Sequence, residues 1–597
     1  MIIGLPISLF SLMGYIFSVH HWLKVPFRLS PLFCCCSLVI LLFWAALAQL
    51  LLPVTLFLIV CGSLLSLTIL VPLLRSRKKT GENPHRDSLI IFTGLVVVSL
   101  LCSFAGRLSV IDDYAYWAII SKSIAMFDGL PASDTTIFAR HLTYTPGLAL
   151  FQYYFFSAGS GYSLPVAYFA QNIFLFSLLF ALTDGQNRLV SLVMLSAAVI
   201  LLVLFAGSVF QKLRVDHFLS VTACAVLWTQ MRNRFSLQRF AVICSAISCL
   251  YLIKEVGFFL AISLLLAVLL DLIFASDIQE KERKASLFLC LGLFFYLILQ
   301  KICWDSHCAA LGFSQFHSGI SLEAIGTAFN LTGNSESRHA FFIFLRDILI
   351  GSADRLNLPY LLWYLLLGLL WCRILKVSDN NERQQYYRQF YLLLPLFLIY
   401  LGMNYVMQVV IFGLGISRET TTSLDRYVNI YFFWFVLFTI ETSLVRTFLA
   451  KKSAKSRRSV VFIIIAALLL AGSSIPHSRK KYERELDALL PELKSHIETG
   501  SRICLTPGNI EDHYLGFRLL YYLFPTKCNV DSFPGDSGRK KLEEKLLACD
   551  YLLFYQPDRK TRHMFSSFTA DKIVHQSLYK VSHHGSAGKP LSLKRIY

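Results

Sequence analysis

The chain has 597 residues, of which 55% are hydrophobic and only 16% are charged, and its formal net charge is +19. A mean hydropathy of +0.58 excludes an ordinary soluble enzyme and favours a polytopic α-helical membrane protein. The charge does not imply a nucleic acid partner, because the basic residues cluster between apolar segments, at Arg75–Lys79, Lys281–Lys284 and Lys451–Arg458. If these connections are cytoplasmic, the positive-inside rule is satisfied at alternate connections along the chain.

Apolar segments recur along most of the chain, and we expect about fourteen transmembrane helices of roughly 20 residues each. The first segment, Met1–Val19, has neither a basic start nor a small-residue cleavage site, so we expect it to be retained as a span. Residues 1–87 are thus expected to form additional N-terminal membrane helices. Residues 88–475 are expected to form the main transmembrane domain, with an outer loop at 107–162 and a last span at Val460–Ala471.

A different composition begins at Pro476. Strand-like runs alternate there with helix-like runs, which indicates one small α/β domain over residues 476–597 on the extracytoplasmic side. The strands are expected at Ser501–Thr506 and Asp550–Tyr555, and the helices at Asp512–Leu523 and Arg539–Leu547. The chain has no convincing internal repeat, which weakens a transporter interpretation because many transporters are built from repeats.

Most of the 15 cysteines lie inside apolar segments, where they behave as small apolar residues. Two pairs on the expected oxidising side, Cys303–Cys308 and Cys504–Cys528, are candidates for disulfides, and spacing alone does not establish either bond. The pair His583–His584 lacks the spaced cysteine or carboxylate partners of a metal site and is interpreted as a surface feature. No cofactor is expected, and a divalent metal is not favoured.

The adjacent acids Asp112 and Asp113 directly follow the apolar segment Ser88–Phe104. Two carboxylates beside a membrane are costly unless they face water, a cation or a reacting group. A carboxylate at the outer face can act as a general base towards an attacking hydroxyl. The alternative is that the pair caps the next helix, since Tyr114–Phe127 has the apolar spacing of an interfacial helix. One aspartate can cap while the other acts.

Charged and aromatic residues from other expected outer connections converge on the same face as this acidic pair. Cations there suit a phosphate at the level of the lipid headgroups, because arginine binds phosphate bidentately and lysine binds it as a point charge. The residues are Tyr144, Asp216, Lys254, Glu255, Arg418, Arg426 and Tyr427. Each also has a plainer interpretation, as a snorkelling lysine, an interfacial anchor or, for Asp216, a helix start.

The order of these features resembles the GT-C superfamily of polyprenyl-phosphate-sugar-dependent glycosyltransferases, whose bacterial members include relatives of aminoarabinose transferase and of the protein mannosyltransferases. The resemblance covers roughly residues 88–530 and is a pattern match of moderate specificity. The matching positions are the pair Asp112–Asp113, the turn Tyr144–Gly147, Lys254 between two short spans, Arg426–Tyr427 before a late span, and Tyr514–Pro525. The chain departs from the family at Thr145, where a proline is usual, and many members carry Asp-Glu in place of Asp-Asp.

The resemblance implies an integral membrane enzyme that transfers a sugar from a polyprenyl-phosphate donor to an envelope glycolipid, polysaccharide or protein. It places the active site on the extracytoplasmic face of the inner membrane. Lys254 and Arg426, with Arg418 and Tyr427, would hold the donor phosphate. Asp113 or Asp112 would deprotonate the acceptor hydroxyl in an inverting displacement, with no nucleic acid and no cofactor involved.

Three other functions remain open from the sequence. One is an O-antigen-ligase-like or polymerase-like transferase that uses a diphosphate-linked glycan. Another is a flippase or transporter of lipid-linked sugars, which would need charged residues inside the spans at mid-membrane depth. The third is a non-catalytic envelope protein in which the acidic pair only caps a helix.

Overall fold

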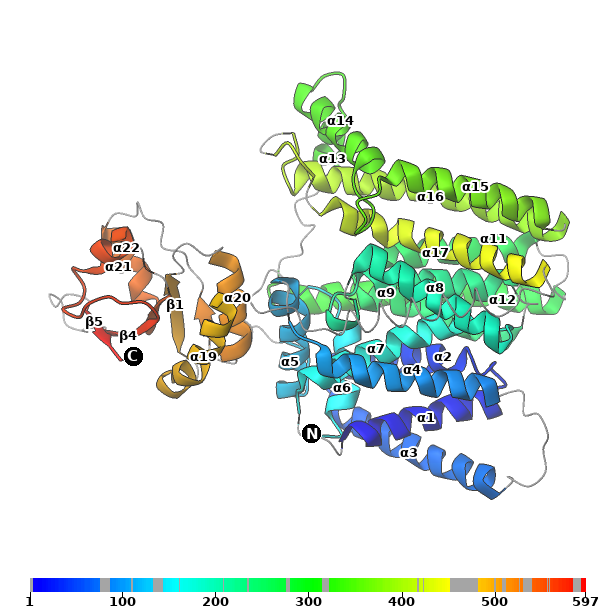
Figure 1. Ribbon diagram of the computed structural model, residues 1–597, viewed down its shortest axis with the longest axis horizontal. Helices are drawn as coiled ribbons and strands as arrows, with labels where there is room; N and C mark the ends of the chain where they lie inside the picture. The colour runs from blue at the N-terminus through cyan, green and yellow to red at the C-terminus, as the bar shows by residue number, and fades with distance from the viewer. Residues whose placement is uncertain are drawn as a thin grey trace. The chain divides into compact units, whose positions relative to one another are not determined.

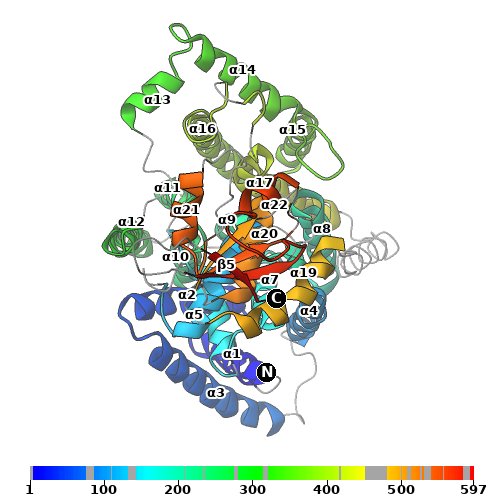
Figure 2. The same ribbon diagram turned by 90° about the vertical axis from the view of Figure 1, so that its left-hand side faces the viewer.

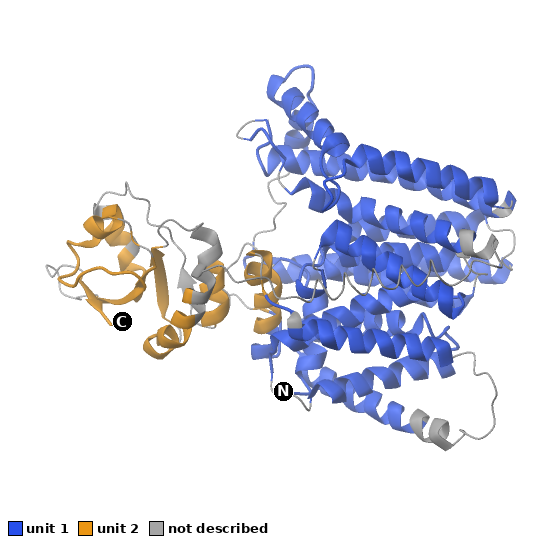
Figure 3. Cartoon of the chain, viewed as in Figure 1, with its two compact units in different colours: residues 1–107, 124–130, 143–475 blue, residues 108–123, 131–142, 476–597 orange. Residues whose placement is uncertain are grey.

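The computed structural model divides the chain into two compact units, which are coloured separately in Figure 3. Unit 1 comprises residues 1–107, 124–130 and 143–475, and unit 2 comprises residues 108–123, 131–142 and 476–597. The described residues are 4–75, 86–108, 111–131, 143–159, 161–207, 209–232, 236–274, 280–313, 321–378, 380–415, 418–421, 423–450, 481–498, 501–506, 512–524, 527–529, 539–555, 557, 559–582 and 592–596.

Unit 1 is a bundle of helices whose long members lie roughly side by side (Figure 1). In Figure 2 several of them, including α12 and α16, are seen nearly end-on. Long uninterrupted apolar runs form these helices, because a backbone out of contact with water must satisfy its own hydrogen bonds. The helices are α1 (Gly4–Trp22), α2 (Ser30–Leu47), α3 (Leu51–Arg75), α4 (Arg86–Ala105), α6 (Gly147–Phe156), α7 (Leu164–Ala181), α8 (Arg188–Ala206), the 3₁₀ turn η2 (Val209–Gln211), α9 (Asp216–Arg232), α10 (Leu237–Ile253), α11 (Gly257–Phe274), α12 (Glu280–Ala310), α13 (Leu322–Ala328), α14 (Ser335–Ile350), α15 (Tyr360–Val377), α16 (Asn380–Val410) and α17 (Leu424–Ala450).

Ten helices in the described part of the chain are long and apolar enough to cross a membrane. The prediction of a polytopic helical membrane protein is thereby confirmed, whereas the expected number of about fourteen spans stays a prediction. The apolar helix α10 is shorter than these ten, and the expected span at Val460–Ala471 lies outside the described residues. Helix α6, in the expected outer loop at 107–162, has ten residues, too few to span a membrane.

The first expected span is formed by α1, which is not among the ten. Small residues let α1 and α3 approach closely. A Cβ at Gly14 would overlap the carbonyl oxygen of Gly62, and the Tyr15 hydroxyl donates to the Leu58 carbonyl at 2.7 Å. Small residues at a helix contact are a common means of association between membrane helices.

The bundle has two ends of different chemistry. At one end α8 and α10 finish and α9 and α17 begin. The opposite end holds an ion pair between Arg239 and Asp184 at 2.5 Å and the buried Arg28, which donates to Ser88 at 2.9 Å and to Ser191 at 2.6 Å. Because α9 and α17 run away from the first end, their C-terminal turns, with Arg446 on α17, lie at the second.

Unit 2 combines a short helical segment with a small α/β fold. The segment consists of the π-helical turn η1 (Asp113–Trp117) and the start of α5 (Ala118–Phe127). The sheet has five strands in the order β2-β1-β3-β4-β5. Strand β1 pairs in parallel with β2 and β3, whereas β4 pairs antiparallel with β3 and β5. Its elements are α19 (Lys481–His496), β1 (Arg502–Thr506), α20 (Asp512–Leu523), β2 (Lys527–Asn529), α21 (Arg539–Leu547), β3 (Tyr551–Phe554), α22 (Arg559–Phe565), β4 (Ser577–Ser582) and β5 (Ser592–Arg595). The expected strands and helices of this region are confirmed.

Both candidate disulfides are wrong. Cys504 is bonded to Cys549, whereas Cys303 and Cys308 are free. In the strand register Cys528 stands opposite Ile503, and the position opposite Cys504 is Asn529. Cys303 and Cys308 are five residues apart on α12, a spacing that places them on different faces of the helix.

Replacing Cys549 by alanine is expected to lower the free energy of unfolding of the C-terminal fold by about 2–4 kcal/mol. The bond joins residues 45 positions apart and therefore restricts the unfolded chain. Trypsin cleavage of the purified full chain across a urea series measures the effect. Cys303→Ala, which removes a free thiol, serves as the control. Equal protease resistance of the wild type and Cys549→Ala would contradict the prediction.

Candidate functional site

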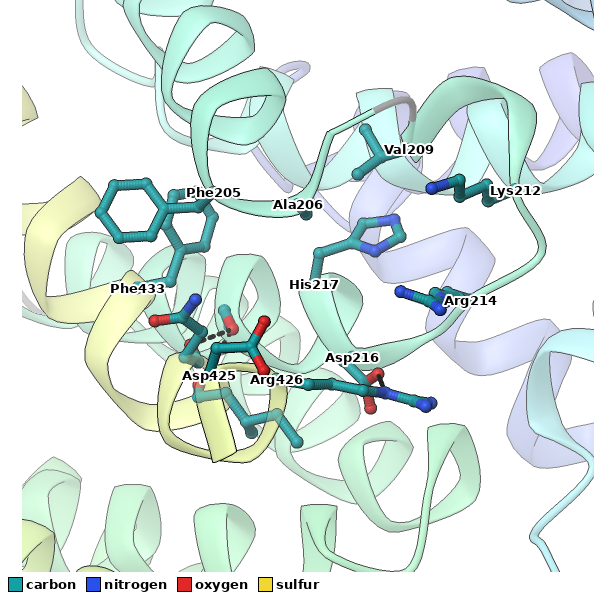
Figure 4. A pocket seen from close by; sticks show the side chains of 13 residues that line it. Phe205, Ala206, Val209, Lys212, Arg214, Asp216, His217, Asp425, Arg426 and Phe433 are labelled. Carbon is teal, nitrogen blue, oxygen red and sulfur yellow. Dashed lines mark hydrogen bonds and ion pairs between the residues drawn. The ribbon is translucent and has the colours of Figure 1, made fainter. Parts of the chain in front are cut away.

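A pocket lies in unit 1 at the end of the bundle where α9 and α17 begin (Figure 4). Its volume is about 90 Å³, enough for a group of a few heavy atoms or several waters. The lining residues come from the end of α8, the connection to α9, and the first turns of α9 and α17. They are Phe205, Ala206, Val209, Lys212, Arg214, Asp216, His217, Ser220, Asp425, Arg426, Asn429, Ile430 and Phe433.

The pocket has an apolar part and a charged part. Phe205 and Phe433 form the apolar part, with ring centroids 5.2 Å apart. Across the pocket lie Lys212, Arg214 and Asp216, as Figure 4 shows. A cavity with these two surfaces suits a ligand that has both an apolar and an anionic portion.

Asp216 joins three elements of the bundle at the charged part. Its Oδ1 accepts from Lys254 Nζ at 2.5 Å, and its Oδ2 accepts from Arg426 Nε. The side chains of Lys254 and Asp216 are 7% and 13% exposed. Charges removed from water in this way are stable only when they are paired, so the three residues hold α9, α17 and the end of α10 together. The Tyr427 ring also lies under the Lys254 ammonium, 5.5 Å from its centroid.

Two further cations line the pocket from the connection between η2 and α9. The backbone of Lys212 and Arg214 is held by Gln171 of α7, whose Nε2 donates to their carbonyl oxygens at 2.8 and 3.5 Å. With Lys254 and Arg426 the site contains four cations, against the two carboxylates of Asp216 and Asp425. The excess is therefore two positive charges.

The helices that begin here add to that positive potential. The N-terminal turns of α9 and α17 both contribute lining residues. Exposed backbone N–H groups and the helix dipole make such ends favourable for anions. His217, in the first turn of α9, is buried, and its Nε2 has no partner among the described residues. The arrangement can bind a small anionic group between two helix ends.

Four residues predicted from the sequence are brought together here: Asp216, Lys254, Arg426 and Tyr427. Asp216 begins α9, as one interpretation predicted, and it also pairs with two cations. Arg418 is exposed in the connection between α16 and α17 and does not line the pocket.

Tyr144 is half-buried in the turn that leads into α6. This turn packs on the end of α10, the helix that delivers Lys254. The Thr145 hydroxyl donates to the Tyr251 carbonyl at 2.8 Å, and a Cβ at Gly147 would collide with the Leu252 carbonyl. The turn therefore supports the residue that pairs with Asp216.

Glu255 follows Lys254 in the connection between α10 and α11. Burial raises the pKa of its carboxyl to about 7, while Lys301 opposes the shift and Asp305 adds to it. Lys301 and Asp305 form an ion pair with each other at 2.6 Å on α12. Glu255 thus faces α12 and lies outside the pocket lining.

Glu255→Gln is expected to stabilise the protein at pH 8 by up to about 3 kcal/mol and to change little near pH 4. With a folded-state pKa of about 7 against an ordinary value of 4.5, the folded protein binds a proton in this window that the unfolded chain has released. The contribution of this group to stability therefore falls as pH rises from 4.5 to 7 and is lowest above pH 7.

Thermal unfolding between pH 4.5 and 8.5 measures how steeply stability falls with rising pH, and Glu255→Gln should make this fall smaller. Glu323→Gln, which replaces an exposed carboxylate on α13, is the control and should follow the wild-type profile. Parallel profiles for the wild type and Glu255→Gln would contradict the prediction.

Asp112 and Asp113 belong to unit 2. Asp112 precedes η1, and its side chain makes no capping hydrogen bond to that turn. Asp113 is the first residue of η1 and is buried. Because no capping hydrogen bond is made, the geometry does not support N-capping by Asp112. The π-helical turn itself is notable, since single turns of this kind are rare and often occur at functional sites.

Lys212 and Arg214 were not among the candidates predicted from the sequence. The one available signal was the pattern Lys212-Leu-Arg214, two cations in a short connection directly before Asp216. Nothing in the spacing shows that α17 brings Asp425 and Arg426 to the same place, since that contact crosses about two hundred residues. Among the described residues, no group of three or more His, Cys, Asp or Glu side chains is arranged to hold a metal ion.

Comparison with known proteins gives no further information about this site. No protein-family model matches the chain, and no curated protein matches it.

Proposed function

We propose that the protein is an integral membrane glycosyltransferase that moves a sugar from a polyprenyl-phosphate donor to an envelope acceptor. The observation that carries the proposal is the pocket with an apolar side at Phe205 and Phe433 and a charged side that has one more cation than carboxylates, with Lys254 adding a second excess charge behind it. A lipid-linked phosphate has the same two parts, an isoprenoid chain and an anionic group.

The phosphate would be held by Arg426, Lys212 and Arg214, with Lys254 behind them. Arg426 contacts Asp216 through Nε, and the two terminal nitrogens of its guanidinium suit a bidentate phosphate contact. In this proposal Asp216 has a positioning role, because it fixes the direction of both Arg426 and Lys254. The N-terminal ends of α9 and α17 add their dipoles to the same anion.

In the proposed reaction the acceptor hydroxyl attacks the anomeric carbon of the donor sugar. Asp113 or Asp112 takes the hydroxyl proton, the bond between the anomeric carbon and the phosphate oxygen breaks, and the configuration inverts. The polyprenyl phosphate leaves with the bonding electron pair, and the cations of the pocket stabilise its growing negative charge. A positioned general base contributes about 10²–10⁴-fold in such reactions.

Two observations favour the extracytoplasmic face for this reaction. The basic residues Lys281–Lys284 lie at the start of α12, at the end of the bundle opposite the pocket, and the positive-inside rule assigns such a cluster to the cytoplasm. The disulfide Cys504–Cys549 suits an oxidising compartment. The acceptor in this proposal is therefore a glycolipid, polysaccharide or protein of the envelope.

One observation favours a flippase or transporter of lipid-linked sugars as a second candidate. Glu441 lies within the span α17 and is fully buried, and neither of its carboxylate oxygens has a hydrogen-bond partner among the described residues. An ionisable residue inside a span is often part of a transport path. Glu441 is outside the pocket, so the two candidates depend on different residues.

Mass spectrometry of envelope glycolipids and polyprenyl phosphates, from cells with and without the gene, tests the proposal. Without the gene we expect one glycosyl-type mass to disappear from an acceptor and the sugar-loaded polyprenyl phosphate to accumulate. Donor trapped on the cytoplasmic side, with restoration depending on Glu441, would favour the flippase. An unchanged glycan profile together with unchanged donor levels would overturn the transferase proposal.

A further inference from the structure

The segment that carries Asp112 and Asp113 packs against α20 of the C-terminal fold. Within unit 2, the Tyr114 ring lies beside Tyr521 and Tyr522, with centroids 5.7 and 6.2 Å away. Tyr114 is buried, and its hydroxyl donates to the Leu108 carbonyl at 2.9 Å. The residue that follows Asp113 is thus fixed on both sides, by the ring contacts and by its hydroxyl.

The buried Arg518 and the half-buried Lys122 strengthen the same contact. The Arg518 guanidinium of α20 lies 5.6 Å from the Tyr114 ring centroid and 5.9 Å from that of Tyr522. Lys122 extends from α5 towards α20, where its Nζ donates to the Tyr521 carbonyl at 2.7 Å and lies 4.9 Å from the centroid of the Tyr521 ring. Cation–π contacts strengthen when the cation is removed from water.

Burying these cations has an energetic cost. Burial lowers the pKa of Lys122 to about 8, and the charge of Lys494 on α19 adds to the shift. The Arg518 side chain is 4% exposed. Their contacts must offset that desolvation, so the cations serve the junction between the segment and α20 rather than solubility.

A short segment needs such support in order to keep a fixed geometry. The π turn η1 has five residues and α5 has ten, and helices of this length are marginal in water on their own. A catalytic side chain that moves by about 1 Å can lose about a hundredfold in rate. The orientation of Asp113 therefore depends on what holds Tyr114.

We propose that α20 of the C-terminal fold is the positioning element for the acidic pair, with Arg518 and Lys122 as its positioning residues. The inference rests on the proposed function, because it assumes that Asp112 or Asp113 acts on the acceptor. It assigns the C-terminal fold a role in catalysis without any contact to substrate.

The experiment compares Arg518→Met, Arg518→Lys and Lys122→Met with the wild type in the full-length, detergent-purified protein. For Arg518→Met we expect kcat for sugar transfer to fall about 10- to 100-fold while KM for the donor stays within about twofold. Arg518→Lys, which keeps the charge over Tyr114, should recover a substantial part of kcat. Lys122→Met alters the other side of the contact without changing the C-terminal fold, so it tests the same inference if Arg518→Met does not fold.

Hydrogen exchange supplies a readout that is independent of activity. In Arg518→Met and Lys122→Met, the backbone amides of residues 111–123 should exchange faster while those of β1 and β3 stay protected. Lys580→Met, which removes the exposed ion pair with Glu498 on the same fold, is the matched control and should leave both regions unchanged.

Wild-type kcat and unchanged exchange of residues 111–123 in both variants would overturn the inference. A loss of kcat with unchanged exchange would overturn it as well, since the segment would then be held without α20. If the wild-type protein itself transfers no sugar from any polyprenyl-phosphate donor, the proposed function fails separately, and the exchange data alone decide whether α20 fixes the segment.

Discussion

Asp216→Asn is expected to lower the free energy of unfolding by about 3–5 kcal/mol, because it leaves the buried Lys254 and the half-buried Arg426 without their shared carboxylate. Lys254 contacts one oxygen of Asp216 at 2.5 Å and Arg426 contacts the other. An amide can accept one of these hydrogen bonds, but it supplies no charge. Thermal unfolding of the purified protein in detergent, followed by size-exclusion chromatography, measures the loss.

The control for this prediction is Asp425→Asn, which removes the other carboxylate of the same pocket. It should cost less than about 1 kcal/mol, as substitutions away from buried charge networks usually do. The double variant Asp216→Asn with Lys254→Met should be less destabilised than the sum of the two single variants, because removing both partners leaves one fewer unpaired charge. A cost below 1 kcal/mol for Asp216→Asn alone would show that the three residues do not depend on one another.

Asp113→Asn or Asp112→Asn is expected to reduce kcat for sugar transfer by about 10²–10⁴-fold, since an amide cannot take the proton from the acceptor hydroxyl. The larger loss identifies the base. Donor affinity should stay near the wild-type value in both variants, because the proposed phosphate ligands are other residues. Turnover with a defined polyprenyl-phosphate sugar and binding of the donor to the inactive variant measure the two effects separately.

Asp128→Asn is the matched control, since Asp128 follows α5 in the same loop and accepts from the Tyr153 hydroxyl at 2.6 Å. It should leave kcat within a few-fold of the wild type. If Asp112→Asn and Asp113→Asn behave like this control, the two acids have a structural role and the base must be sought elsewhere.

Much of the architecture could be predicted from residue patterns. The apolar segments indicated a helical membrane protein, and alternating runs gave α20, α21, β1 and β3 nearly to the residue. Both signals are local, because hydrophobic periodicity reports what one element buries. The number of spans was harder to predict, since helices such as α1 and α10 do not reach the length or hydropathy of an ordinary span.

The contacts of the site could be predicted only in part. Lys254, Arg426 and Asp216 were each recognisable as charges beside apolar segments, but their mutual pairing depends on packing across 38 and 210 residues. The bond between Cys504 and Cys549 depended on strand order and register, which spacing does not contain. The packing of residues 108–123 with the C-terminal fold could not be predicted from local patterns either, because the contact of Lys122 with Tyr521 joins residues 399 positions apart.

The ion network around Asp216 also has a consequence for the biogenesis of the protein. Lys254 follows Asp216 by 38 residues, whereas Arg426 follows it by 210. Synthesis of the 172 residues from Lys254 to Arg426 (210 − 38) takes about 9–34 s at ordinary rates. During that interval the nascent chain contains the neutral pair Asp216–Lys254, and Arg426 joins only when α17 inserts. Chains that stop before α17 therefore lack the final cation, so the completed network distinguishes molecules that contain α17 from those truncated before it.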